Sequence, residues 1–171
     1  MVRDRSRIKA VQAIKFKSVI NEGQLAKLTK QEILTLKLGQ SHCKLICALL
    51  FWCEGGKEVK SGMYFINSDP AMICMFLKLF RSSFDLDDRK FRIMLHIHSY
   101  HNEAQQILYW SNLTQIPANQ FYKPFHKPHT GKNKKPGYQG CISVRYLNAH
   151  VAKQLKMTYV LFADKVHRGV R

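Results

Sequence analysis

The sequence predicts an α+β domain, a mixed α/β sandwich in which helices alternate with the strands of one sheet. Residues 91–98 alternate between apolar and polar side chains, with the period of a half-buried strand. Residues 71–81 instead repeat their apolar side chains at helical spacing, directly after Asp69 and Pro70, which are residue types favoured at a helix start. With 171 residues, of which 46% are hydrophobic, the chain can bury a substantial core.

The elements of this domain are expected in the order helix, strand, helix, strand, helix, strand, strand, helix. The first is a nearly all-apolar helix over residues 41–54, capped by Ser41 and ended by Gly55 and Gly56. The others are a strand at 63–67, a helix at 71–81, a strand at 91–98, a helix at 102–113, a hairpin of strands at 121–127 and 140–147, and a helix at 148–155. Strands interleaved with helices in this way are typical of the α+β class.

Residues 1–40 are predicted to form a basic helical arm, and residues 41–171 the domain itself. Two short helices with a turn at Glu22 and Gly23 are expected in the arm, the second capped by Thr29. This pair is interpreted as a possible helix-turn-helix remnant, and the alternative is an arm that packs on the domain.

The charge of the chain points to an anionic partner. Lysine and arginine number 28 and aspartate and glutamate 11, which gives a net charge of +17, and nucleic acid is the partner that we predict. The longest apolar run, residues 45–53, is about half of a membrane-spanning helix, so no membrane partner is expected. No secretory signal is visible, and the odd number of cysteines indicates free thiols. We therefore expect a protein that is not secreted and is cytoplasmic, or nucleoid-associated in a bacterium.

A basic and aromatic stretch over residues 121–138 is the main candidate for nucleic-acid contact. Lysines and arginines on a two-stranded ribbon suit phosphate contact and groove reading, and the interleaved aromatic side chains suit stacking on unpaired bases. The alternative is a solvated loop beside core aromatics. The predicted nucleic-acid-binding residues, here and on neighbouring elements, are Lys57, Lys60, Arg92, His96, His98, Lys123, Lys127, Lys132, Lys134, Lys135 and Arg145.

Two groups of residues have a spacing that metal ligands also use. His96, His98 and His101 lie on or just beyond one strand face, but no convincing further ligand accompanies them. We interpret them as surface histidines near phosphate. Cys43 and Cys47 share one helix face and are interpreted as small buried hydrophobic residues.

Glu54 is the predicted metal-binding residue. The dipole of the preceding helix disfavours a carboxylate at its C-terminal end, and a divalent cation such as Mg²⁺ would offset that cost. The alternative is an exposed glutamate beside Lys57.

Residues 47–55, CALLFWCEG, resemble the LAGLIDADG motif of homing endonucleases, and the strand and helix that follow as far as residue 80 resemble that family as well. The resemblance implies an αββαββα half whose sheet carries helices on one face, and a motif helix at the interface of a homodimer. It also implies that the last acidic residue of the motif, here Glu54, holds the catalytic metal. The implied dimer-interface residues are Ala48, Leu49, Phe51 and Trp52.

The expected function is therefore that of a DNA endonuclease, a homodimer that cleaves phosphodiester bonds with Mg²⁺. Two departures from the motif favour a non-catalytic DNA-binding regulator on the same scaffold: Leu49 replaces a small residue, and Trp52 replaces the first acidic one. The lysine-rich aromatic stretch favours a third class, an RNA-binding or ribosome-associated protein.

Overall fold

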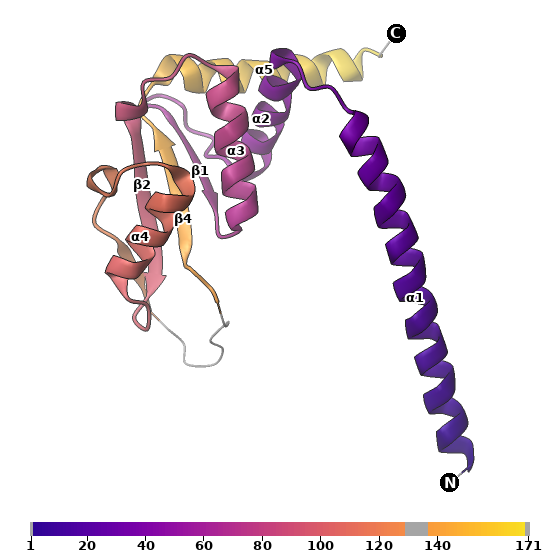
Figure 1. Ribbon diagram of the computed structural model, residues 1–171. Coiled ribbons are helices and arrows are strands. Elements are labelled where there is room, and N and C mark those ends of the chain that lie inside the picture. The colour runs from indigo at the N-terminus through magenta and orange to yellow at the C-terminus, as the bar shows by residue number, and fades with distance from the viewer. Residues whose placement is uncertain (1, 129–136, 170–171) are drawn as a thin grey trace. The chain divides into compact units, whose positions relative to one another are not determined.

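The computed structural model describes residues 2–128 and 137–169, with side chains described at Arg7 and from Val11 onward (Figure 1). The chain divides into two compact units, with the boundary between Leu38 and Gly39. Each unit is a separate structural body.

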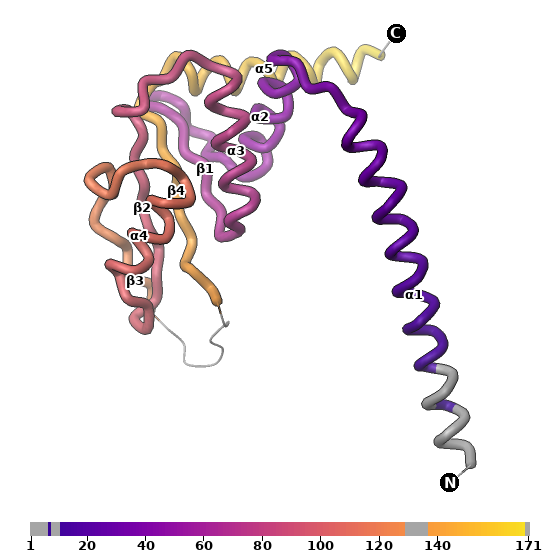
Figure 2. Tube along the Cα trace, in the orientation of Figure 1, coloured from indigo at the N-terminus to yellow at the C-terminus, as the bar shows by residue number. Residues whose placement is uncertain are grey.

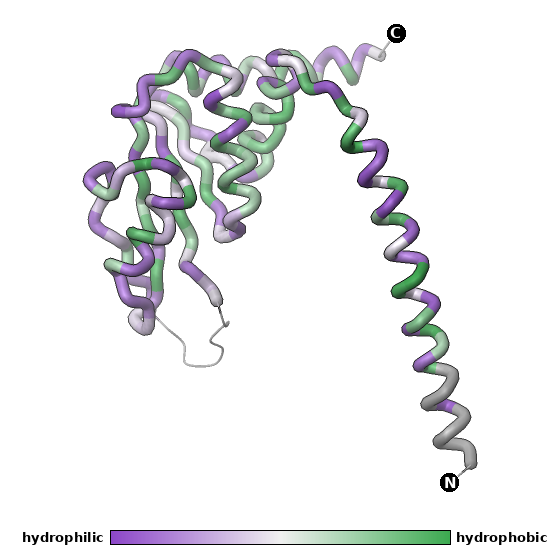
Figure 3. The backbone as a smooth tube through the Cα atoms, in the orientation of Figure 1, coloured by the Kyte–Doolittle hydropathy of each residue, from purple (hydrophilic) through white to green (hydrophobic). Residues whose placement is uncertain are grey.

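The first unit is one helix, α1 (Val2–Thr35). The predicted pair of short helices is wrong, because α1 continues without a break through Glu22 and Gly23. A glycine inside a helix costs about 1 kcal/mol relative to alanine, which the good helix formers on both sides of Gly23 offset. Hydrophobic and hydrophilic residues are interspersed along the coloured part of α1 (Figure 3), and apolar side chains such as Phe16 and Leu34 are exposed.

The second unit is a four-stranded sheet with helices on one face, so the predicted α+β class is confirmed. Its strands lie in the order β1-β4-β2-β3, and Figure 2 shows the short β3 at one edge. The elements are α2 (Gln40–Glu54), β1 (Met63–Asn67), α3 (Pro70–Ser83), β2 (Phe91–His98), α4 (Glu103–Thr114), β3 (Phe125–Lys127), β4 (Cys141–Tyr146) and α5 (Ala149–His167), with single 3-10 turns at Asp88–Lys90 and Ala118–Gln120.

Strand β4 is an inner strand that pairs antiparallel with both β1 and β2. The predicted hairpin between residues 121–127 and 140–147 is therefore wrong, because β2 lies between β3 and β4. Strand β3 is parallel to β2 and only three residues long. Pro124, which has no N–H to donate to a ladder, immediately precedes it and explains why the strand does not begin at Phe121.

The core lies between the sheet and its helices. Phe65, Ile93 and Val144 are fully buried on the covered side of three neighbouring strands. Helix α2 packs against α3 and α5, and the ring of Phe76 in α3 stacks on Phe65 with their centroids 4.0 Å apart. The buried indole of Trp110 in α4 donates a hydrogen bond of 2.7 Å to the carbonyl of residue 139, which fixes the segment leading into β4.

The helix starts follow local hydrogen bonding. The Asp69 carboxylate accepts a bond of 2.9 Å from the Ala71 N–H and Pro70 is the first residue of α3, as predicted. The start of α2 differs from its prediction, because Gly39 and not Ser41 is the N-cap residue. The Gly39 N–H donates to Nδ1 of His42 at 3.2 Å, which fixes the helix start earlier.

Candidate nucleic-acid interface

The side of the sheet opposite the helices forms a mixed basic and aromatic surface, here called the open face. Strand register defines its members, because paired residues point to the same side of a sheet. They are Tyr64 and Ile66 of β1, Arg92, Met94, His96 and His98 of β2, Phe125 and Lys127 of β3, and Cys141, Ser143 and Arg145 of β4. The structure thus brings five of the predicted nucleic-acid-binding residues together, namely Arg92, His96, His98, Lys127 and Arg145.

Arg145 occupies the middle of the open face between two tyrosine rings. Its guanidinium carbon lies 5.9 Å from the ring centroid of Tyr64 and 5.8 Å from that of Tyr122, a geometry of cation–π contact. The Nε atom is buried and has no hydrogen-bond partner among the described residues. No described carboxylate forms an ion pair with this guanidinium. Arg145 is therefore held by stacking and not by an acidic partner.

A second arginine, Arg92, lies directly opposite Arg145 in the β2–β4 ladder. Like charges at directly opposed positions destabilise a sheet. Arg92 donates from Nη1 to the carbonyls of Arg89 and Phe91, at 2.7 Å in each case, and forms no ion pair with a described residue. The pair makes this part of the surface attractive to an anion.

The pKa of His96 is affected by the positive charges of the open face. Burial lowers its pKa from the usual value, and the charges of Lys127 and Arg145 lower the pKa further. Its ring lies 5.7 Å from that of Phe125. The imidazole is therefore neutral at neutral pH, and the charge of the open face comes from its arginines and lysine.

The structure does not assemble the histidine triad as a metal site. Nδ1 of His101 accepts from the His98 N–H at 3.1 Å, and Nε2 lies 3.0 Å from the carbonyl of Tyr138. Both ring nitrogens of His101 thus serve the backbone. Among the residues that the structure describes, no group of three or more histidine, cysteine or acidic side chains is placed to hold a metal ion.

Glu54 is exposed at the end of α2 and forms no ion pair with a described residue. Its charge acts on the thiol of Cys141, at the start of β4. Burial raises the pKa of Cys141, the charge of Lys127 lowers it, and the charge of Glu54 raises it. Glu54 is thus an exposed carboxylate whose charge acts on one residue of the open face, Cys141.

The glycines beside Glu54 serve packing. Gly55 forms an isolated bridge with Phe65, and the Gly56 N–H donates to the carbonyl of Tyr64 at 3.0 Å. A Cβ atom at Gly55 would collide with the ring of Phe51, and one at Gly56 would collide with the ring of Tyr64. These glycines thus allow close packing of Phe51 and Tyr64 against the backbone of the same chain.

The remaining predicted cations are not gathered on the open face. Lys57 donates from Nζ to the carbonyl of Trp52 and so caps the C-terminal end of α2. Lys60 is exposed and lies 3.8 Å from the carboxylate of Glu58. Lys123 is exposed ahead of β3. The predictions for Lys132, Lys134 and Lys135 fall outside the described residues.

The predicted dimer interface needs correction. Ala48 and Phe51 are 0% and 2% exposed, because this side of α2 packs into the core of its own chain. Leu49 is partly buried against the same core. Trp52 is 44% exposed, and its ring stacks on Tyr159 of α5 at a centroid distance of 5.0 Å. Of the four predicted residues, only Trp52 offers a substantial surface to another molecule.

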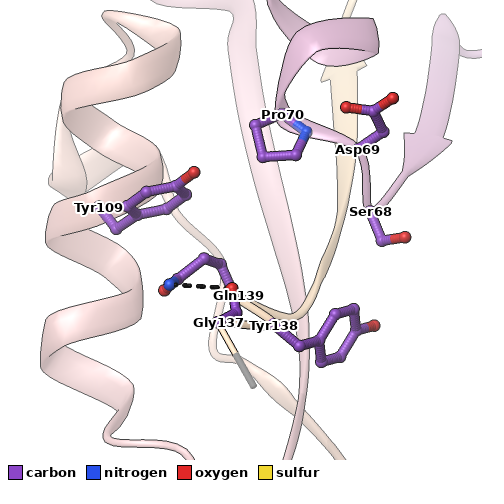
Figure 4. Close-up of a pocket in the computed structure, with 7 residues that line it drawn as sticks. All are labelled: Ser68, Asp69, Pro70, Tyr109, Gly137, Tyr138 and Gln139. Atoms are coloured by element: carbon purple, nitrogen blue, oxygen red, sulfur yellow. Dashed lines mark hydrogen bonds between the residues drawn. The ribbon is translucent and has the colours of Figure 1, made fainter. Parts of the chain in front are cut away.

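A hollow of about 360 Å³ lies between the start of α3, helix α4 and the segment before β4 (Figure 4). Its polar groups serve the fold: Asp69 caps α3, and the Gln139 amide donates to the carbonyl of Gly137 at 3.2 Å. None of the described residues that line it is cationic. It is therefore a poorer candidate for an anionic ligand than the open face.

Tyr64 is an open-face residue that sequence reasoning did not select. The alternation of β1, with Met63 and Phe65 buried, places Tyr64 on the opposite side of the strand. That period of two is visible in the sequence. The contact between Tyr64 and Arg145 is not, because it depends on the pairing of β1 with β4.

None of the described helices is both long enough and apolar enough to cross a membrane. Comparison of the chain with family models, with curated protein sequences and with solved structures found no match.

Proposed function

We propose that the open face binds nucleic acid, with duplex DNA as the principal ligand. The observation that carries this proposal is the set of cationic side chains on one helix-free sheet surface, with Arg92 and Arg145 directly opposed and unpaired by any described carboxylate. Tyr64, Tyr122 and Phe125 add aromatic surface among these charges. Cationic side chains bind the phosphate backbone, and strands can present side chains to base edges in a groove.

The order of elements supports the resemblance to the LAGLIDADG family. In the αββαββα half that the resemblance implies, two strands follow the motif helix. Here the bridge of Gly55 with Phe65 stands at the place of the first of them, and β1 is the second. Helix α3, strands β2 and β4, and helix α5 then supply the remaining elements in order, with α4 and β3 as an insertion.

A metal-dependent DNA endonuclease is the more specific proposal, and the exposed carboxylate of Glu54 at the C-terminal end of α2 favours it. Mg²⁺ bound there would supply Lewis-acid chemistry to a phosphodiester. Glu54 is free to act as a ligand, since no described cation pairs with it. A homodimer would present one Glu54 from each subunit. A non-catalytic DNA-binding regulator shares every feature of this proposal except the metal.

The binding proposal is tested by fluorescence anisotropy on the full chain, with a labelled random-sequence DNA duplex as the probe. We expect binding that weakens steeply as salt rises from 50 to 200 mM, by about a thousand-fold if six phosphates are contacted. Structured RNA serves as competitor. Displacement of the duplex by equimolar RNA would favour an RNA-binding protein, and an affinity insensitive to salt would contradict the electrostatic basis of the proposal.

The endonuclease proposal is tested by plasmid nicking with Mg²⁺ or Mn²⁺. Glu54→Gln should abolish nicking and preserve DNA binding, because it removes the charge that holds the metal. Glu58→Gln is the matched control, since Glu58 is also exposed and close to α2 in sequence. Equal nicking by wild type and Glu54→Gln would contradict the assignment. Binding without nicking, on a library that contains the selected target, would favour the regulator.

A further inference from the structure

Arg145 differs from the other cations of the open face in that two aromatic rings flank it. Tyr64 and Tyr122 lie within 6 Å of its guanidinium, which restricts the plane of this group. Its Nε atom is buried, so a ligand can reach only the terminal Nη groups. The side chain therefore presents a fixed, flat fork of N–H donors.

The donors of this fork are not used inside the protein. The Nε atom of Arg145 has no hydrogen-bond partner, and its guanidinium forms no ion pair, among the described residues. Arg92, its neighbour in the ladder, instead donates hydrogen bonds from Nη1 to two backbone carbonyls. A buried polar atom without a partner costs stability. The arrangement thus keeps the Arg145 fork available to a ligand at some cost to the fold.

A rigid fork suits a base edge better than a phosphate. Phosphate contact is satisfied by any nearby positive charge, including a flexible lysine such as Lys127 on the edge strand β3. A guanine presents two acceptors, O6 and N7, in one plane in the major groove, and an arginine fork matches both. Arg145 belongs to β4, which has a neighbouring strand on each side and so lies away from the edges of the open face.

We propose that Arg145 is the specificity-determining residue of the open face and recognises a guanine base, with Tyr64 and Tyr122 as positioning residues that hold its guanidinium. This inference rests on the proposed function. It goes beyond it in naming the chemical group that one residue recognises.

The test is selection of binding sites from a random DNA duplex library by the full-length protein, followed by sequencing of the bound pool. Wild type is expected to select one position at which guanine is preferred by about ten-fold or more. Arg145→Gln should lose this preference or shift it to adenine, because an amide matches the edge of adenine. Preferences at other positions should stay the same.

Variants of the flanking tyrosines separate positioning from folding. Tyr122→Leu should weaken the guanine preference, and Tyr122→Phe should retain it because the ring remains. Lys127→Gln is the control for a phosphate contact, with an affinity that falls equally for all sequences. Thermal unfolding of each variant verifies that it is folded.

An unchanged guanine preference in Arg145→Gln overturns the inference. So does a uniform loss of affinity in that variant, which would make Arg145 a phosphate contact, and so does a wild-type pool without a preferred guanine. If wild type binds no DNA at all, the proposed function fails, and the inference fails with it. Binding without base preference overturns the inference alone.

Discussion

The two faces of the sheet are made by the same strands and differ in charge and in the exposure of most of their side chains. The covered face carries Phe65, Ile93 and Val144, all fully buried. The open face carries Tyr64, Arg92 and Arg145 at the neighbouring positions of the same strands, all of them only partly buried. Because side chains alternate along a strand, one residue step changes the surroundings from core to a charged surface. Stability and ligand binding are thus expected to respond to different substitutions.

The largest expected effect is the loss of a core aromatic ring. Phe65→Ala should lower the free energy of unfolding by about 3–5 kcal/mol, because it leaves a cavity where the ring stacks on Phe76. Tyr64→Ala, one residue away on the open face, should cost about 1 kcal/mol. Urea unfolding followed by far-UV circular dichroism measures both. Equal destabilisation by the two changes would show that the open face is also part of the core.

A smaller and separate effect is expected for charge on the open face. Lys127→Gln should reduce the slope of log affinity against log salt by about 1, because one phosphate contact is lost. Lys153→Gln, an exposed lysine on α5, should leave that slope unchanged. Salt titrations of DNA binding by anisotropy make the comparison. A similar change in both variants would mean that binding follows net charge and not the open face.

Acidity should strengthen binding through His96. Its pKa lies below about 6.5 in the free protein, so it is neutral above that pH. A bound phosphate favours the charged form and raises this pKa, so DNA affinity should rise as pH falls from 7.5 to 5.5. The stability of the free protein depends on pH in the opposite direction. The unfolded chain takes up the proton more readily than the folded protein, so the free energy of unfolding decreases as pH falls.

His96→Gln should flatten the pH dependence of binding measured by anisotropy. The matched control is His150→Gln, since His150 is exposed in the first turn of α5 and is not an open-face residue. If His150→Gln flattens the profile as much as His96→Gln does, the pH dependence belongs to overall charge.

The smallest effect is expected at a buried hydroxyl of the open face. Ser143 is fully buried, and its Oγ has no partner among the described residues. Ser143→Ala should leave the free energy of unfolding unchanged or raise it by up to about 1 kcal/mol, because it removes an unsatisfied polar group. Thr114→Val, which removes a buried hydroxyl that donates to the Trp110 carbonyl, should lower it by about 1 kcal/mol. Denaturant titrations distinguish the two signs.

Local patterns predicted most elements of the second unit. The strands at 63–67 and 91–98 have the predicted bounds, since alternation is a local property of the chain. The predicted pair of helices in the arm is wrong, because the helix-forming residues on both sides of Gly23 offset the cost of one glycine. The predicted hairpin is wrong because strand pairing depends on the whole sheet, and β4 pairs with β1 and β2 instead of β3.

The candidate site was predictable in composition and not in arrangement. Alternation alone places Arg92, His96 and His98 on one side of a strand. The contacts of Arg145 with the rings of Tyr64 and Tyr122 join residues that are far apart in sequence, and no local pattern predicts them. The orientation of α2 was equally hidden, because a helix that is apolar nearly all round does not show which side, here that of Ala48 and Phe51, faces its own core.

The inner position of β4 also governs when the chain can fold during synthesis. Neither β1 nor β2 has an antiparallel partner until residues 141–146 leave the ribosome. Up to that point the apolar sides of β1 and β2 do not belong to a completed sheet that the helices can cover, and such surfaces are prone to aggregate or to bind chaperones. A nascent chain stalled before residue 141 should therefore be far more sensitive to protease than one stalled after α5 has emerged.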